Sequence, residues 1–248
     1  MTKIALICVF AFALAKALAD TNDTLVVDYT PNLNGHPWPR VPVVTYVEST
    51  SNVWVHPTAP KTFPAIREIH DKDSDFTTVV IWFPDGAEFK TYNEFVLGPY
   101  LSAVYSGDFN GDGIPDYMAI KPTTGCGIGG EQSIGVFAFS SGKDYRFTRV
   151  HTWGLGPHDL VIDPVSREFR FMQTTFVQGK TLDGRYHAFW VHRFFKWENG
   201  SFRFDPGMSP VWVQYLDRPN HEPTKLLSPK LKAKIWSEDL DSESRIEF

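Results

Sequence analysis

The sequence predicts an all-β protein, with propeller-like antiparallel blades and one short helix near its C-terminus. Three observations lead to this prediction. Aromatic residues make up 15% of the chain and gather with β-branched residues in short apolar runs. Gly, Pro, Asn and Asp interrupt these runs at short intervals, as expected for strands joined by turns. Three glycine-centred hairpin patterns also recur at nearly equal spacing.

Candidate strands follow one another along most of the chain. Within 145–152, for example, Thr148 and Val150 alternate with Phe147 and Arg149, which is the period of two expected for a strand with two different faces. The expected strands, in chain order, are 24–29, 41–47, 77–83, 87–92, 117–121, 133–139, 145–152, 170–176, 187–197, 201–204 and 211–215.

One helix is expected, at residues 228–240. Ser228 can cap its N-terminus, and Pro229 suits its first turn. Leu231 and Ile235 are four residues apart and therefore share one face of the helix. The chain should then end in an acidic tail.

The repeated hairpin pattern consists of an aromatic residue, a short turn with a glycine, and a second aromatic residue. It occurs at 83–89 (FPDGAEF), 139–145 (FSSGKDY) and 197–202 (WENGSF). The glycines, Gly86, Gly142 and Gly200, are 56 and 58 residues apart. A unit of this length suits a four-stranded blade, so the spacing favours three to four blade-equivalents. The alternative is that three hairpins of an ordinary all-β protein are evenly spaced by chance.

The first 19 residues have the pattern of a secretory signal peptide. Lys3 precedes an apolar run over 4–15, and Ala17 and Ala19 form a small-x-small cleavage site. The run is shorter than the roughly 20 residues of a membrane-spanning helix, and no transmembrane segment is expected. The predicted organisation, for a secreted or periplasmic protein, is a signal peptide at 1–19, a propeller-like domain at 20–227, and the helix and tail at 228–248.

Charge and cysteine content exclude some classes of partner and cross-link. Cleavage removes two lysines and no acid, so the formal net charge changes from −5 to −7. Such a chain has no basic surface for nucleic acid or an anionic membrane. Cys8 leaves with the signal peptide, so Cys126 stands alone and no internal disulfide is expected.

An acidic loop lies near the middle of the chain, in GDFNGDGIPDYMAI. Asp108, Asn110 and Asp112 occupy alternate positions, and Asp116 follows four residues later. Ca²⁺ takes six to eight oxygen ligands, and this spacing can fold the side-chain oxygens and the Ile114 carbonyl around one centre. Three carboxylates favour Ca²⁺ over Mg²⁺, which keeps more of its water. The loop therefore predicts a structural Ca²⁺ site.

The loop resembles the FG-GAP and VCBS repeats, whose blades open with Asp-x-Asn-x-Asp-Gly-x-x-Asp. It is not an EF-hand, because Ala119 stands at position twelve, where an EF-hand has glutamate. The resemblance covers residues 107–150 and implies an integrin-α-like propeller blade with a calcium loop. Members usually carry several such loops. Here 71–75 and 163–169 lack the glycine and are expected to be ordinary turns.

A catalytic site is the alternative to a metal-stabilised domain. Cys126 lies in a glycine-rich segment, and with His151 or His158 it could form a nucleophile–base pair oriented by Asp159. That would make the protein a secreted hydrolase. The alternative is a cysteine that is only a small buried side chain.

The expected function is that of a secreted, calcium-stabilised binding or scaffold module for an unknown protein or glycan ligand. The aromatic segment 189–197 supports a carbohydrate-binding module as a further alternative, although it also suits a core strand. His187 and His192 are five residues apart on this segment and should point to opposite faces, so they cannot share one metal ion.

Overall fold

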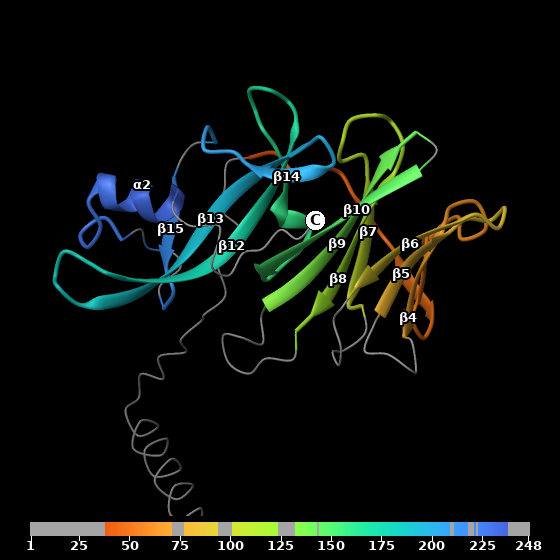
Figure 1. The fold of residues 1–248 in the computed structure, drawn as a ribbon, viewed down its shortest axis with the longest axis horizontal. Helices are drawn as coiled ribbons and strands as arrows, with labels where there is room; N and C mark the ends of the chain where they lie inside the picture. Colours follow the sequence, from red (N-terminus) through yellow and green to blue (C-terminus); the bar gives the residue numbers. More distant parts are fainter. Residues whose placement is uncertain are drawn as a thin grey trace, which may run out of the picture.

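The computed structural model describes residues 38–70, 77–93, 101–123, 132–142, 144–208, 211–217, 221 and 223–237. In these residues the chain forms three antiparallel sheets and one α-helix (Figure 1). The prediction of an all-β protein with a C-terminal helix is confirmed. None of the helices in these ranges is long and apolar enough to cross a membrane. The expected signal peptide and the strand at 24–29 lie outside the described residues.

The first sheet has the strand order β2-β3-β4-β5-β6. Its strands are β2 (Val47–Thr50), β3 (Val53–Val55), β4 (Ala65–His70), β5 (Thr77–Trp82) and β6 (Glu88–Asn93). β2 lies at an edge, all four of its residues are exposed, and its register against β3 shifts between Glu48 and Thr50.

The middle sheet has the order β1-β7-β8-β9-β10. Its strands are β1 (Val44–Thr45), β7 (Ala103–Gly107), β8 (Asp116–Pro122), β9 (Gln132–Ser141) and β10 (Asp144–Trp153). β9 and β10 pair over their whole length, from Gln132 opposite Trp153 to Ser141 opposite Asp144.

The third sheet has the order β11-β12-β13-β14, and β15 also pairs with β13. Its strands are β11 (Leu160–Ile162), β12 (Phe169–Lys180), β13 (Tyr186–Glu198), β14 (Ser201–Phe204) and β15 (Trp212–Tyr215). A 3₁₀ turn, η2 (Pro157–Asp159), precedes it, and α2 (Pro229–Ser237) packs against it. The Ser228 hydroxyl accepts a hydrogen bond from the Leu231 amide at 3.2 Å, so the predicted cap is present.

Each predicted glycine hairpin belongs to a different sheet. Gly86 turns the chain between β5 and β6, Gly142 between β9 and β10, and Gly200 between β13 and β14, with φ of 91°, 71° and 83°. These positive values suit the left-handed backbone of a tight hairpin. The spacing of 56 and 58 residues therefore corresponds to one such hairpin in each sheet.

The sheets do not close into a ring, and the propeller-like arrangement of three to four blades is not observed in the described residues. The middle sheet instead lies between the other two (Figure 1). On β9, Val136 and Ala138 pack toward the first sheet, whereas Phe137 and Phe139 pack toward the third. Because alternate residues of a strand point to opposite faces, both faces of the middle sheet are covered.

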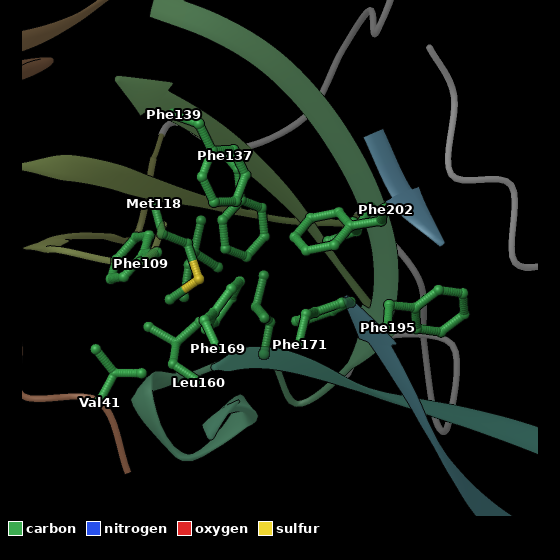
Figure 2. Packing of buried hydrophobic residues seen from close by; sticks show 13 residues of the cluster. Val41, Phe109, Met118, Phe137, Phe139, Leu160, Phe169, Phe171, Phe195 and Phe202 are labelled. Carbon is green, nitrogen blue, oxygen red and sulfur yellow. The ribbon is translucent and has the colours of Figure 1, made fainter. Parts of the chain in front are cut away.

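The core between the middle and third sheets is rich in phenylalanine. Figure 2 shows these side chains converging from several strands. Phe137 is fully buried, and its ring centroid lies 5.2 Å from that of Phe202 and 5.5 Å from that of Phe171. Phe109, from the acidic loop, stacks on Phe169 at 5.6 Å. The core therefore anchors the loop to the third sheet.

Candidate metal centre

The acidic loop connects β7 and β8 and curls around the carboxylate of Asp108. Asp108 Oδ1 accepts hydrogen bonds from the main-chain amides of Gly111 at 2.7 Å and Asp112 at 3.1 Å, and Oδ2 accepts one from Gly113 at 3.0 Å. Both glycines have φ of +80°, in the left-handed region where other residues are strained. The backbone therefore folds inward, as a loop that collects oxygen ligands must do.

Ser140 of β9 joins the loop to the neighbouring strand. Its hydroxyl donates to Asp112 Oδ2 at 2.6 Å, and its carbonyl accepts a hydrogen bond from Asn110 Nδ2 at 2.9 Å. Partial burial opposes ionisation of Asp112, but hydrogen bonds from Ser140, Ile114 and Asn110 outweigh it and keep the pKa of Asp112 below its ordinary value. Asp112 therefore carries a negative charge at neutral pH.

Asp116 is fully buried at the start of β8 and closes the loop. Its Oδ2 accepts hydrogen bonds from the amides of Phe109 at 2.6 Å and Asn110 at 3.0 Å, and its Oδ1 accepts one from the Ser140 amide at 2.6 Å. Burial raises the pKa of Asp116 to about 6, although these hydrogen bonds oppose the change. Holding this group ionised therefore costs free energy, which a nearby cation would offset.

The potential ligands of the loop are oxygen atoms, the kind of ligand that Ca²⁺ takes. Among the described residues, no three Asp, Glu, His or Cys side chains stand ready as a metal cluster. A carboxylate has about four acceptor positions, and Asp108 and Asp112 each use three of them within the protein. Each therefore has about one acceptor position that none of the described residues occupies. The Ca²⁺ site, with Asn110, Asp116 and the Ile114 carbonyl, stays a prediction.

Two other acidic segments, 71–75 and 163–169, lack the glycine of the acidic loop. Residues 71–75 lie outside the described ranges. In the turn between β11 and β12, Asp163 Oδ1 accepts a hydrogen bond from the Val165 amide at 2.9 Å and Oδ2 one from the Ser166 hydroxyl at 2.8 Å. Asp163 Oδ2 also lies 3.7 Å from the Arg170 guanidinium. This carboxylate caps a turn and pairs with a cation.

A cavity of about 480 Å³ opens beside the acidic loop. It is lined by residues of the acidic loop, among them Asp108 and Asn110, and by residues 162 and 167–170 around the turn between β11 and β12. Residues 196–198 of β13 and residues 41–42 complete the lining. The acidic loop and the β11–β12 turn hold comparable places, since each joins two neighbouring strands of its sheet. The space between the two turns is thus partly lined by the candidate metal loop.

The structure describes only part of the proposed nucleophile–base arrangement. Cys126 lies outside the described residues. The His151 carbonyl accepts a hydrogen bond from Gln173 Nε2 at 2.7 Å, while burial and Arg149 lower the pKa of the His151 imidazole. His158 Nε2 lies 3.4 Å from Asp159 Oδ2. The structure therefore places one candidate histidine beside the acid expected to orient it.

Asp159 is itself unusual, because its carboxyl group is fully buried. Its Oδ2 accepts a hydrogen bond from the Gly156 amide at 3.0 Å, whereas Oδ1 has no hydrogen-bond partner among the described residues. Burial raises the pKa of Asp159 well above its ordinary value, against the opposing effects of Gly156 and Arg40. The folded protein therefore favours the protonated carboxyl group.

We expect Asp159→Asn to reduce the loss of thermal stability as pH rises above about 4. The unfolded chain releases the Asp159 proton near the ordinary aspartate pKa, while the folded protein keeps it up to a higher pH. Across that window the unfolded state binds fewer protons, so the native state loses stability as pH rises. Melting temperatures of both proteins, measured between pH 4 and 8, check this expectation.

Asp183→Asn is the matched control with the opposite sign. Hydrogen bonds from Thr181 and His187 lower the pKa of Asp183, so its contribution is present above the unfolded pKa and is lost as pH falls. Between pH 4 and 8 the difference between Asp183→Asn and wild type should therefore stay nearly constant, while that of Asp159→Asn changes. The Asp183 difference should change only below about pH 4. If Asp159→Asn kept the wild-type pH profile, the buried carboxyl group would not be a source of pH dependence.

Sequence reasoning did not identify Ser140 as part of the loop, or Arg167, Arg170 and Trp197 as lining of the cavity. Ser140 lies in a predicted hairpin, but no motif connects it with a loop some 30 residues earlier. Trp197 lies in the aromatic segment 189–197, but the sequence does not show which other residues share a surface with it. Only folding brings these residues to the loop.

Comparisons with family models, with curated proteins and with solved structures found no match to this chain. The resemblance to FG-GAP and VCBS repeats therefore rests on the residues of the acidic loop and the hairpin that follows it.

Proposed function

We propose that this chain is an exported β-sheet binding module, in which Ca²⁺ bound by the acidic loop keeps a ligand cavity in shape. One observation carries the proposal: Asp108 and Asn110 belong both to the candidate metal loop and to the wall of the 480 Å³ cavity. A cation that orders the loop would therefore order the binding surface. The proposed role of the ion is structural.

Electrostatics support an ion in this position. Asp108, Asp112 and Asp116 lie within nine residues, and Asp116 is fully buried. A divalent cation would reduce the repulsion between these carboxylates and the cost of burying one of them. Asp108, Asn110, Asp112, Asp116 and the Ile114 carbonyl would supply its oxygen ligands.

The connections of the loop explain how an ion would act on the cavity. Ser140 holds the loop on β9, and Phe109 inserts into the core shared with the third sheet. Phe109 also lines the cavity, directly beside Asp108 and Asn110. Loosening the loop would therefore change both polar and aromatic parts of the cavity lining.

Ca²⁺ is expected to raise the melting temperature, and a chelator to reverse the change. At a hundredfold excess over the dissociation constant, a single site that exists only in the folded state adds about 2.7 kcal/mol. For a chain of this size that corresponds to an increase of about 5–10 °C. Asp112→Ala should abolish the increase, because it removes one of the charged ligands.

Asp163→Ala is the control, since Asp163 occupies the comparable turn of the third sheet but caps it through Val165 and Ser166. This variant should melt at a lower temperature and still respond to Ca²⁺. A wild-type melting temperature that is the same with Ca²⁺ and with chelator would contradict the calcium role. So would an undiminished response in Asp112→Ala.

A further inference from the structure

We propose that the cavity beside the acidic loop binds a saccharide, with Trp197 as the surface on which the sugar ring packs. This inference deepens the proposed function and rests on it, since it assigns the ligand class of the same binding module. Three features of the cavity support it: a fixed tryptophan, a lining of both charges, and an exposed arginine at one wall.

Trp197 is held in place from within the protein. Its ring stacks on Phe139, with 3.7 Å between centroids and 14° between planes. The Phe202 ring lies 5.4 Å away between centroids, at 72° between planes. Trp197 is half-buried, and its remaining surface lines the cavity. An aromatic ring that is already immobilised loses little entropy on binding. A sugar ring presents a face of C–H groups that packs on such a surface.

The charged lining favours a ligand that both donates and accepts hydrogen bonds. Three cationic and three anionic side chains line the cavity: Arg167, Arg170, Lys196, Asp108, Glu168 and Glu198. These six charges sum to zero, so the lining offers no net attraction to a polyanion such as a phosphate-rich ligand, or to a strongly basic peptide. Sugar hydroxyl groups can donate to the carboxylates and accept from the cations. The mixed lining therefore selects a hydroxyl-rich ligand.

Arg170 gives this lining a fixed geometry. Its side chain is only 6% exposed, and its Nε donates to Asp205 Oδ2 at 2.8 Å. One terminal nitrogen lies 3.1 Å from Glu168 Oε2, and the other donates to the Phe169 carbonyl at 2.9 Å. Arg170 thereby positions Glu168 at the cavity. Polar groups that are fixed before binding contribute more to specificity than mobile ones.

Arg167 is the cation that a ligand can engage most directly. It lies in the turn between β11 and β12 with φ of 64°, and its side chain is exposed. It forms no ion pair with another described residue. Its guanidinium can bind hydroxyl groups, or the carboxylate of a uronic acid in a bidentate manner. Neutral and acidic saccharides both present a sugar ring that can pack on Trp197. Arg167 distinguishes them, because only the acidic ones offer a carboxylate to its guanidinium.

The test is binding of the full chain, in Ca²⁺, to a panel of immobilised neutral and uronate-containing oligosaccharides, followed by calorimetric titration with the best binder. Trp197→Ala is expected to weaken that binding about tenfold or more, as for other buried aromatic contacts. Trp82→Ala is the matched control, because Trp82 is 43% exposed on the first sheet and does not line the cavity. It should leave the affinity unchanged.

Arg167→Asn keeps the test valid if Trp197→Ala does not fold. Asparagine tolerates the left-handed backbone of this turn. The variant should fold like wild type and bind uronate-containing saccharides more weakly, with a smaller loss for neutral ones. Failure of wild type to bind any saccharide would overturn the proposal, as would affinities unchanged in both cavity variants. A Ca²⁺-dependent melting temperature without saccharide binding would refute only this inference, whereas the reverse result would refute only the calcium role.

Discussion

Replacing Lys121 with methionine is expected to lower the free energy of unfolding by about 3–5 kcal/mol, because it leaves a buried carboxylate without its cation. Lys121 Nζ of β8 lies 2.6 Å from Glu68 Oε1 of β4, and the side chains are 6% and 0% exposed. Glu68 Oε2 accepts a hydrogen bond from the Leu101 amide at 2.9 Å. The pair thus connects the first and middle sheets through two buried side chains.

Urea unfolding of three variants separates the cost of an unpaired charge from the value of the pair. Adding Glu68→Gln to Lys121→Met should recover part of the loss, since no buried charge then remains. Lys196→Met is the control, because the Lys196–Glu198 pair is 38% and 47% exposed at 3.3 Å, and exposed pairs contribute about 0–1 kcal/mol. If Lys121→Met were no more costly than Lys196→Met, the buried pair would not stabilise the sheet contact.

Phe137→Ala is expected to cost about 3–5 kcal/mol, the range for removing a fully buried aromatic ring. Phe137 lies on β9, and Figure 2 shows it among side chains from both sheets of this core. Its centroid is within 6.3 Å of those of Phe109, Phe139 and Phe202. Rings already held by one another cannot move far enough to fill the space.

Chemical denaturation measures this loss, with Tyr186→Ala as the control. Tyr186 also carries an aromatic ring on a long strand, but it is 76% exposed, so its truncation should change stability by no more than about 0.5 kcal/mol. Phe137→Leu should lie between the two. Equal effects of Phe137→Ala and Tyr186→Ala would show that the phenylalanine core does not hold the sheets together.

Local features of the fold were predictable from the sequence. The hairpins at Gly86, Gly142 and Gly200 and the cap at Ser228 were correct, because the residues that determine them are neighbours in the chain. β3, β4, β7 and β11 were not predicted. β4, for example, reads AIREIH, and its Glu68 looks unsuited to burial until Lys121, 53 residues later, is placed beside it. Such a partner cannot be identified from the strand itself.

The predicted propeller-like arrangement of the sheets is not confirmed, for a related reason. Evenly spaced hairpins correspond to one such hairpin in each sheet, but they do not show how the sheets pack. Alternation of Val136 and Ala138 with Phe137 and Phe139 shows that both faces of β9 are covered, and this is compatible with an open stack as well as with a ring. Whether the sheets form a closed ring depends on contacts between residues that are far apart in the chain.

One part of the candidate site, the acidic loop, could also be predicted from the sequence, whereas the cavity lining could not. Asp108, Asn110, Asp112 and Asp116 could be selected from the sequence, because the spacing of ligands within one loop is a local property. Trp197 could not be assigned to the same region, since it reaches the cavity only through the pairing of β13 in the third sheet. Sequence therefore predicts the metal loop better than the ligand surface.

An open stack, unlike a closed ring, leaves strands whose backbone groups could pair with another molecule. At β2 the shift in register between Glu48 and Thr50 interrupts the straight row of donors and acceptors that an incoming strand needs. Glu48 also places a carboxylate there, which accepts a hydrogen bond from the Asn52 amide at 3.1 Å. This edge is therefore protected against self-association into fibrils, even though Val47 is 47% exposed.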